Sequence, residues 1–241
     1  KSAIQKHRSE CSKDQNILSQ CAPIQSARRL YDMKKSVLCF GDSNTWGYNP
    51  KDGSRYPSEM RWTGVLQQKL GPGFRVIEEG LNGRTTTINE MERPMRSAAD
   101  ILPVLIESHR PLDFIVLMLG TNDLKTHFER TPENIADDLS DLCAIVCGHQ
   151  MLVQAPPKLI LVAPTGPDDS SRQLPEWFQK THEKWRELLD LLPGVAQKYG
   201  AEFLATQEVM KMQFQDGLHW SVEQHQDFAA ALMSLLKTAE S

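Results

Sequence analysis

Short apolar runs of β-forming residues alternate with helical patterns from Met33 onward, and this alternation restricts the fold of the 241-residue chain more than any other feature. Five runs favour strands, at residues 36–40, 74–79, 113–119, 158–163 and 201–205. The remaining segments show helical spacing, around residues 62–70, 97–109, 132–147, 175–199 and 222–237. Continuous apolar strands that alternate with helices are typical of a parallel sheet covered on both faces. The sequence therefore predicts a three-layer α/β/α domain with a five-stranded parallel sheet.

Two of the helices carry clear start signals. Thr131 is a suitable cap, and Pro132 stands at the first helical position, where its missing N–H has no partner to lose. The stretch SVEQ at residues 221–224 resembles a capping box. We expect helices to begin at both places.

Long irregular segments follow the first four predicted strands. In parallel sheets, ligands bind beyond the carboxyl ends of the strands, and a rigid scaffold lets loops there carry function. The four segments are GDSNTWGYNPKDGSRYPSEMR, GLNGRTTTINEMERPMR, GTNDLKTHFER and PTGPDDSSRQLPEW. We expect them to converge on one end of the sheet and to form the functional site.

Composition excludes several classes of protein. Hydrophobic residues make up 40% and charged residues 24% of the chain, which is globular, and the formal net charge of −4 gives no reason to expect nucleic acid or an anionic membrane as partner. No apolar run approaches the roughly 20 residues that span a bilayer. The five cysteines are odd in number and lack paired CxxC spacing, which argues against a disulfide framework and a zinc site. We expect a cytoplasmic protein.

The first 32 residues differ from the rest of the chain. They contain six Lys or Arg and three Asp or Glu and show no clear period, and MKKSVLCF then leads directly into the first predicted strand. We interpret residues 1–32 as an N-terminal extension and residues 33–241 as the functional domain.

The first strand ends on Gly-Asp-Ser-Asn, residues 41–44, a group that favours turns and helix caps. One interpretation is that Asp42, Ser43 and Asn44 only cap the following helix. The other is that Ser43 is a nucleophile at the mouth of the sheet. A nucleophilic serine needs a base, an orienting acid and donors for an oxyanion.

His219 is the strongest of seven histidines as the base. It lies in DGLHWS, where Asp216 precedes it by three residues and Gly217 allows the turn that folds the carboxylate back onto the imidazole. An Asp-x-x-His pair can also serve merely as a cap or a surface hydrogen bond.

Donors occur on two other loops. Gly83 in GLNGRTT leaves its backbone N–H open to a close approach, and Asn122 in LGTND offers an amide that does not titrate. With the Ser43 N–H they could form a three-donor oxyanion hole. The alternative is that both are ordinary turn residues.

Together the four motifs, FGDSNTWG, the Gly of GLNGRTT, the Asn of LGTND, and DGLH, resemble the blocks of the SGNH hydrolases, also called the GDSL esterase and lipase family. The resemblance runs from Met33 to the C-terminus, and RWTGVLQQKLG and PLDFIVLMLGTNDLK are most similar to the bacterial arylesterase branch, which includes acyltransferases with perhydrolase activity. It implies a flavodoxin-like sheet of order 2-1-3-4-5 and no metal or organic cofactor.

The resemblance also implies the roles of the site residues. Ser43 would be the nucleophile, His219 the base and Asp216 its orienting carboxylate, while Gly83 and Asn122 join the Ser43 N–H in the oxyanion hole. Asn44 departs from the pattern, because GDSL has leucine there, and it bears on the packing beneath the nucleophile and the polarity of the acyl pocket. Several aromatic residues are candidates to line the substrate site, namely Trp46, Tyr48, Trp62, Trp177, Phe178 and Trp220.

The function predicted from these features is hydrolysis of short-acyl carboxylic esters, with acyl transfer to an alcohol or peroxide as an additional activity. The long loops at 47–62 and 164–176 could bury apolar surface between protomers, so we expect a homo-oligomer. The alternatives are a carbohydrate acetylesterase, a non-catalytic binding domain on the same fold, and a nucleotide-binding module. The last lacks both GxGxxG and GxxxxGK.

Overall fold

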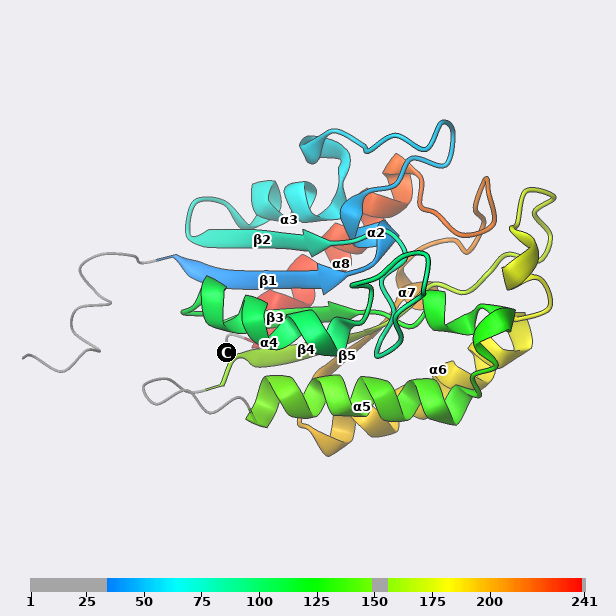
Figure 1. Ribbon diagram of the computed structural model, residues 1–241. Helices are drawn as coiled ribbons and strands as arrows, with labels where there is room; N and C mark the ends of the chain where they lie inside the picture. The colour runs from blue at the N-terminus through cyan, green and yellow to red at the C-terminus, as the bar shows by residue number, and fades with distance from the viewer. Residues whose placement is uncertain (1–33, 149–155, 240–241) are drawn as a thin grey trace, which may run out of the picture. The chain divides into compact units, whose positions relative to one another are not determined.

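The computed structural model describes residues 34–148 and 156–239, and Lys35–Ser241 forms a compact unit of its own. The extension predicted at residues 1–32 lies outside the described residues. Within them a five-stranded sheet has the order β2-β1-β3-β4-β5, and every neighbouring pair is parallel (Figure 1). The strands are β1 (Lys35–Gly41), β2 (Phe74–Gly80), β3 (Phe114–Met118), β4 (Lys158–Ala163) and β5 (Glu202–Ala205). The predicted α/β fold and strand order are confirmed.

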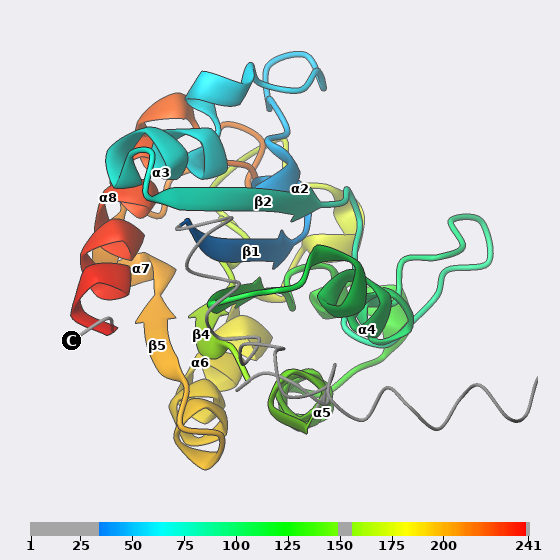
Figure 2. The same ribbon diagram turned by 90° about the vertical axis from the view of Figure 1, so that its left-hand side faces the viewer.

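Helices cover both faces of the sheet, as Figure 2 shows in the end-on view. On one face lie α3 (Trp62–Leu70) and α8 (Val222–Ala239), and on the other lie α4 (Ala98–His109), α5 (Pro132–Gly148) and α6 (His182–Lys198).

Alternate side chains of a strand pack against the helices on opposite faces of the sheet. In β1, Val37 and Cys39 belong to the core beneath α3 and α8, whereas Leu38 and Phe40 belong to the core beneath α4, α5 and α6. All four side chains are fully buried. Because side chains alternate across a strand, burial on both faces explains why the central strands β1, β3 and β4 are largely apolar, whereas the edge strands β2 and β5 also carry charged residues.

The predicted helix starts are confirmed by their hydrogen bonds. Thr131 Oγ1 accepts the N–H of Asn134 at 3.2 Å, and the Ser221 and Gln224 side chains bond each other's backbone N–H.

One helix begins later than predicted, because α6 starts at His182 rather than near residue 175. Pro175 instead precedes a short 3-10 turn, η4 (Glu176–Phe178). Lys180 then takes a left-handed conformation with φ of 62°, which a continuous helix does not allow.

The carboxyl ends of the strands point to the same end of the domain, and long loops gather there (Figure 1). These loops hold short helical turns, in chain order α2 (Ser43–Trp46), η1 (Ser58–Met60), η2 (Asn122–Leu124), η3 (Thr126–Phe128) and α7 (Thr206–Val209). None of the helices in residues 34–148 and 156–239 combines the length and apolar character that a bilayer span requires.

Candidate active site

Ser43 lies on a sharp turn between a strand and a helix. β1 ends at Gly41, the Asp42 side chain accepts the N–H of Asn44 at 3.0 Å, and Ser43 is the first residue of α2. The turn is tight because α2 packs directly on neighbouring strand ends: a Cβ at Gly80 would lie 2.2 Å from the backbone N of Trp46. Capping therefore falls to Asp42, which leaves the Ser43 hydroxyl free to face the loops.

The Ser43 hydroxyl is the end of a chain of hydrogen bonds. Ser43 Oγ lies 2.9 Å from His219 Nε2, and His219 Nδ1 lies 2.7 Å from Asp216 Oδ2. The other carboxylate oxygen accepts the backbone N–H groups of Leu218 and His219, at 3.0 and 2.9 Å. The structure thus brings together the three side chains that the sequence singles out.

The ionisation of Asp216 decides which nitrogen of His219 carries the proton. Burial alone would raise the pKa of Asp216, but the hydrogen bonds and the charge of His219, with the two backbone N–H groups, outweigh it and hold the pKa below its usual value. An ionised Asp216 can only accept, so Nδ1 of His219 must donate to it. Nε2 of the neutral imidazole is then free to accept the Ser43 proton.

Asn44 ties the serine turn to the histidine loop. Its side chain is buried, Oδ1 accepts the N–H of Trp220 at 3.1 Å, and Nδ2 lies 3.3 Å from the backbone oxygen of Leu218 and from Thr165 Oγ1. Leu218 and Trp220 flank His219 on either side. The polar groups of Asn44 are therefore occupied by the protein itself.

The two candidate oxyanion donors lie close together. Asn122, in η2, donates one N–H of its amide to the backbone oxygen of Arg84 at 3.0 Å, which leaves its second N–H available. Gly83, which directly precedes Arg84, has a φ of 78°, a conformation that favours glycine. The buried Arg84 guanidinium donates to the carbonyls of Gly41 at 2.8 Å and of Glu79, so it joins this loop to the ends of β1 and β2.

A buried carboxylate, Asp123, and a half-buried one, Asp138, anchor the same loop from the other side. Thr86 Oγ1 lies 2.6 Å from Asp123 Oδ1 and 2.8 Å from Asp138 Oδ2. A hydroxyl carries a single proton, so it can donate to only one of the two. Burial raises the pKa of Asp123 to about 6 despite the hydrogen bonds from Thr86, and a protonated Asp123 could donate to Thr86 in turn. Burial likewise raises the pKa of Asp42 to about 6.

Five loops line a cavity of about 460 Å³ that opens beside these groups. Ser43, Gly83, Asn122, Asp216 and His219 all lie on its wall. Further lining residues were not singled out by sequence reasoning: Pro50, Asn82, Arg93, Thr121, Lys125, Gln173, Pro175 and Leu218. Three of them lie inside the quoted motifs, namely Asn82, Thr121 and Leu218, and Lys125 follows Asn122 by three residues.

The expected aromatic lining is only partly present. Tyr48 lines the cavity and its ring lies 4.1 Å from that of His219, and Trp177 and Phe178 line it too. The prediction is wrong for Trp62 and Trp220, because both are fully buried in the core, where each ring packs against Phe228.

Trp46 also lies outside the cavity lining, and its ring contacts the Arg55 guanidinium instead. In the part of the chain that the structure describes, no group of three or more His, Cys, Asp or Glu side chains could hold a metal ion.

The structure is similar to those of several esterases. Over 86% of this chain and all of the other, the structure is similar to that of Est24, a carbohydrate acetylesterase from Sinorhizobium meliloti, with a TM-score of 0.79 and 36% identity. It is equally similar to the native aryl esterase of M. smegmatis, with a TM-score of 0.79, 36% identity, and coverage of 85% and 99% of the two chains. Among curated proteins, none matches the chain.

The fold and these similarities define a carboxylic ester hydrolase. Residues 39–226 match the GDSL-like Lipase/Acylhydrolase family, and the chain belongs to that family.

Proposed function

We propose that this hydrolase cleaves short-acyl esters, such as aryl and alkyl acetates, with Ser43 as nucleophile, His219 as base and Asp216 as its orienting carboxylate. The observation that carries the proposal is the unbroken series of hydrogen bonds from Asp216 through His219 to Ser43, on the wall of a cavity that also exposes Gly83 and Asn122. Each member of the series has the partner that its role requires.

The reaction follows from these contacts. Ser43 Oγ attacks the ester carbonyl carbon while its proton moves to His219 Nε2. The negative charge that forms on the carbonyl oxygen is stabilised by the N–H groups of Ser43 and Gly83 and the free amide N–H of Asn122. The tetrahedral intermediate breaks its bond to the alcohol oxygen, which takes the proton from His219, and an acyl-enzyme remains. Water then repeats the sequence with His219 as base and releases the acid.

An acyl-chain series tests the proposal. Hydrolysis of 4-nitrophenyl esters from acetate to decanoate should be fastest for the shortest chains, and Ser43→Ala should lower kcat by several orders of magnitude with little change in stability, because the members of such a unit act together. Ser108→Ala is the matched control, since Ser108 is exposed on α4 away from the cavity. Labelling with a fluorophosphonate and intact mass measurement should show one adduct, absent in Ser43→Ala. Near-normal turnover by Ser43→Ala would rule out the mechanism.

Carbohydrate acetylesterase activity is the second candidate. It is supported by the similarity to Est24 and by polar side chains on the cavity wall, among them Asn82 and Gln173, that could bond sugar hydroxyls. Release of acetate from acetylated sugars, compared with release from phenyl acetate at equal concentration, distinguishes the two.

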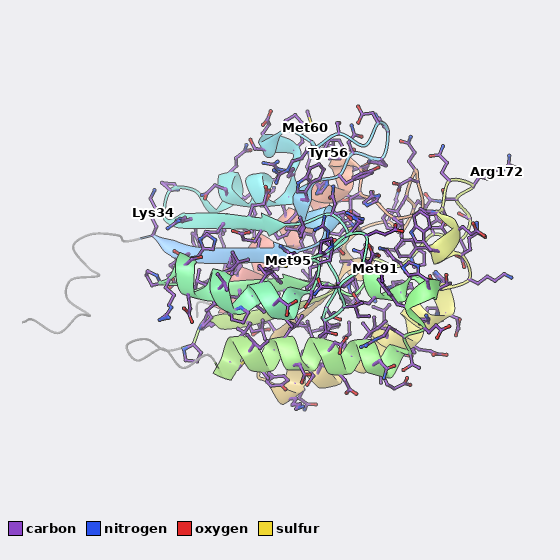
Figure 3. The ribbon with its side chains drawn as sticks, in the orientation of Figure 1. Lys34, Tyr56, Met60, Met91, Met95 and Arg172 are labelled. Atoms are coloured by element: carbon purple, nitrogen blue, oxygen red, sulfur yellow. The ribbon has the colours of Figure 1, made fainter. Side chains whose placement is uncertain are left out.

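We also propose a homo-oligomer with acyl transfer to alcohols or peroxide in addition to hydrolysis. Large apolar side chains near the loop end are exposed, including Met91 at 98%, Met95 at 59% and Trp177 at 48%. Figure 3 shows Met91 and Met95 on the segment between β2 and α4. Burial of such side chains against a second copy would restrict water near the acyl-enzyme. Light scattering tests the assembly, and product analysis with benzyl alcohol in buffer tests the transfer.

A cytoplasmic location completes the proposal. It is supported by Cys39, Cys143 and Cys147, which are free thiols. Fractionation of cells that express the tagged chain tests it.

A further inference from the structure

The cavity wall beside Gly83 carries a positive charge that forms no ion pair with a described carboxylate. Arg93 lies between β2 and α4, and its Nη1 is 2.7 Å from the position that a Cβ on Gly83 would occupy. Its Nη2 donates to the backbone oxygen of Asn82 at 2.8 Å. In the described part of the chain no carboxylate forms an ion pair with Arg93. The guanidinium is exposed, and it has donors to spare for a ligand.

Neighbouring residues add to this excess of positive charge. Arg96 donates through Nε to the same Asn82 oxygen at 3.0 Å, and it too lacks an ion pair with any described carboxylate. Glu90 is already bound, since its Oε1 lies 2.6 Å from Lys125 Nζ and 3.6 Å from His127 Nε2. Glu92, the other carboxylate on this segment, is exposed and does not line the cavity.

The other charged groups on the cavity wall have partners within the protein. Asp216 accepts hydrogen bonds from His219 Nδ1 and from the backbone N–H groups of Leu218 and His219, and Lys125 forms an ion pair with Glu90. Arg93 is therefore the lining side chain whose charge is left for a ligand, although the chain as a whole has a formal net charge of −4.

We propose that Arg93 forms a subsite for an anionic group, a carboxylate or its equivalent, on the alcohol portion of the ester. The inference rests on the proposed short-acyl esterase function: an acetyl group has no place for a charge, so the charge must lie on the leaving group. A guanidinium recognises a carboxylate through two parallel N–H···O bonds, which fixes orientation as well as adding affinity.

Paired substrates isolate the charge. 3- and 4-Acetoxybenzoate are compared with the corresponding acetoxybenzamides, which have nearly the same shape and no charge. For each pair the ratio of kcat/KM, anionic over neutral, is measured in wild type and variants. The ratio cancels any general effect of a substitution on Gly83, because that effect acts on both esters alike.

Arg93→Gln should lower the ratio roughly fivefold for at least one of the two isomers, which is the size expected for an ion pair at a solvent-accessible site. Arg93→Lys, which keeps the charge, should retain part of the preference. The wild-type ratio should decline toward the Arg93→Gln value as salt is raised. Arg172→Gln is the matched control, because Arg172 is exposed on a loop outside this cavity lining (Figure 3) and its loss should leave the ratio unchanged.

The outcomes separate the two claims. If wild type hydrolyses neither member of a pair, the proposed esterase function fails. If it hydrolyses the neutral ester and the ratio is the same in wild type and Arg93→Gln for both isomers, the subsite is overturned while the esterase function stands. An equal fall of the ratio in Arg172→Gln would also overturn it, since the effect would then come from overall charge.

Discussion

The side chain of Asn44, next to the candidate nucleophile, accepts the backbone N–H of Trp220, next to the candidate base, at 3.1 Å. Its amide group also lies 3.3 Å from the Leu218 oxygen, so one side chain holds both neighbours of His219. Asn44 thus links the turn that carries Ser43 to the loop that carries His219.

Asn44→Leu should weaken both stability and activity. Leucine cannot bond the Trp220 N–H or the Leu218 oxygen, and each buried group left unpaired costs about 1–3 kcal/mol. We expect the melting temperature to fall by several degrees and kcat by about tenfold or more, as measured by thermal unfolding and 4-nitrophenyl acetate turnover. Asn44→Asp keeps the acceptor and should retain the Trp220 bond. Full stability and activity in Asn44→Leu would show that the bridge does not position His219.

Gly83→Ala should impair turnover. The left-handed conformation of Gly83 disfavours a Cβ by about 1–2 kcal/mol, and that Cβ would collide with the Arg93 guanidinium. A shift of the Gly83 N–H from the oxyanion should lower kcat/KM by at least about tenfold. Gly73→Ala is the control, because a Cβ there meets nothing within 4 Å. Equal kinetics in the two variants would remove Gly83 from the oxyanion hole.

Asp216→Asn should lower kcat by about three to four orders of magnitude, and less than His219→Ala does. The amide cannot serve as the ionised acceptor that keeps the proton on Nδ1, yet the imidazole remains present as a base. Single-turnover hydrolysis of 4-nitrophenyl acetate measures both effects. Activity of Asp216→Asn near that of wild type would mean that Asp216 only shapes the loop.

Asp123→Asn should gain stability relative to wild type as pH rises from 4 to 6. Burial raises the pKa of Asp123 to about 6, above its unfolded value of about 3.9, so the favourable contribution of the protonated form is complete below pH 4 and is lost as pH rises through 6. Asparagine does not ionise, so the Asp123→Asn variant does not lose this stability as pH rises. Its free energy of unfolding relative to wild type should therefore rise between pH 4 and 6, by up to about 3 kcal/mol.

Denaturant unfolding at a series of pH values measures this difference. Asp141→Asn, at an exposed position on α5, supplies the control for loss of a carboxylate. A difference between Asp123→Asn and wild type that stays constant with pH would show that Asp123 does not titrate in this range.

Deletion of residues 1–32 should leave hydrolysis and the melting temperature essentially unchanged, because β1 begins at Lys35 and the described core lies in later residues. Thermal unfolding and turnover of 4-nitrophenyl acetate check this. Loss of solubility or activity on deletion would place those residues within the functional unit.

Local sequence signals were sufficient for the sheet and most of its helices. Each strand differs by only a residue or two from its predicted bounds. The central strands β1, β3 and β4 are apolar runs because both of their faces are buried, whereas the edge strands β2 and β5 were identified from shorter apolar stretches that include charged residues. The start of α6 escaped prediction, since the break at Lys180 involves neither glycine nor an internal proline. A lysine in a left-handed conformation has no clear signature in the sequence.

Part of the candidate site could likewise be predicted from the sequence, and part could not. Ser43, Gly83, Asn122, Asp216 and His219 could be found because each follows a strand or lies in a compact motif. Trp220 was misjudged because adjacency in sequence does not fix direction: His219 faces the cavity while Trp220 points into the core. The bridging role of Asn44 depends on contacts between loops far apart in the chain, and the unpaired charge of Arg93 depends on how the single loop between β2 and α4 folds.

The distance in sequence between Ser43 and His219, 176 positions, has a consequence for biosynthesis. Ser43 emerges from the ribosome early, but its candidate base His219 arrives only after all five strands of the described sheet have been made. Under the proposed mechanism, a nascent or truncated chain that stops before the DGLH motif should lack esterase activity, however well its first strands pair. Recovery of esterase turnover during refolding therefore reports closure of the whole domain and not the formation of any one part.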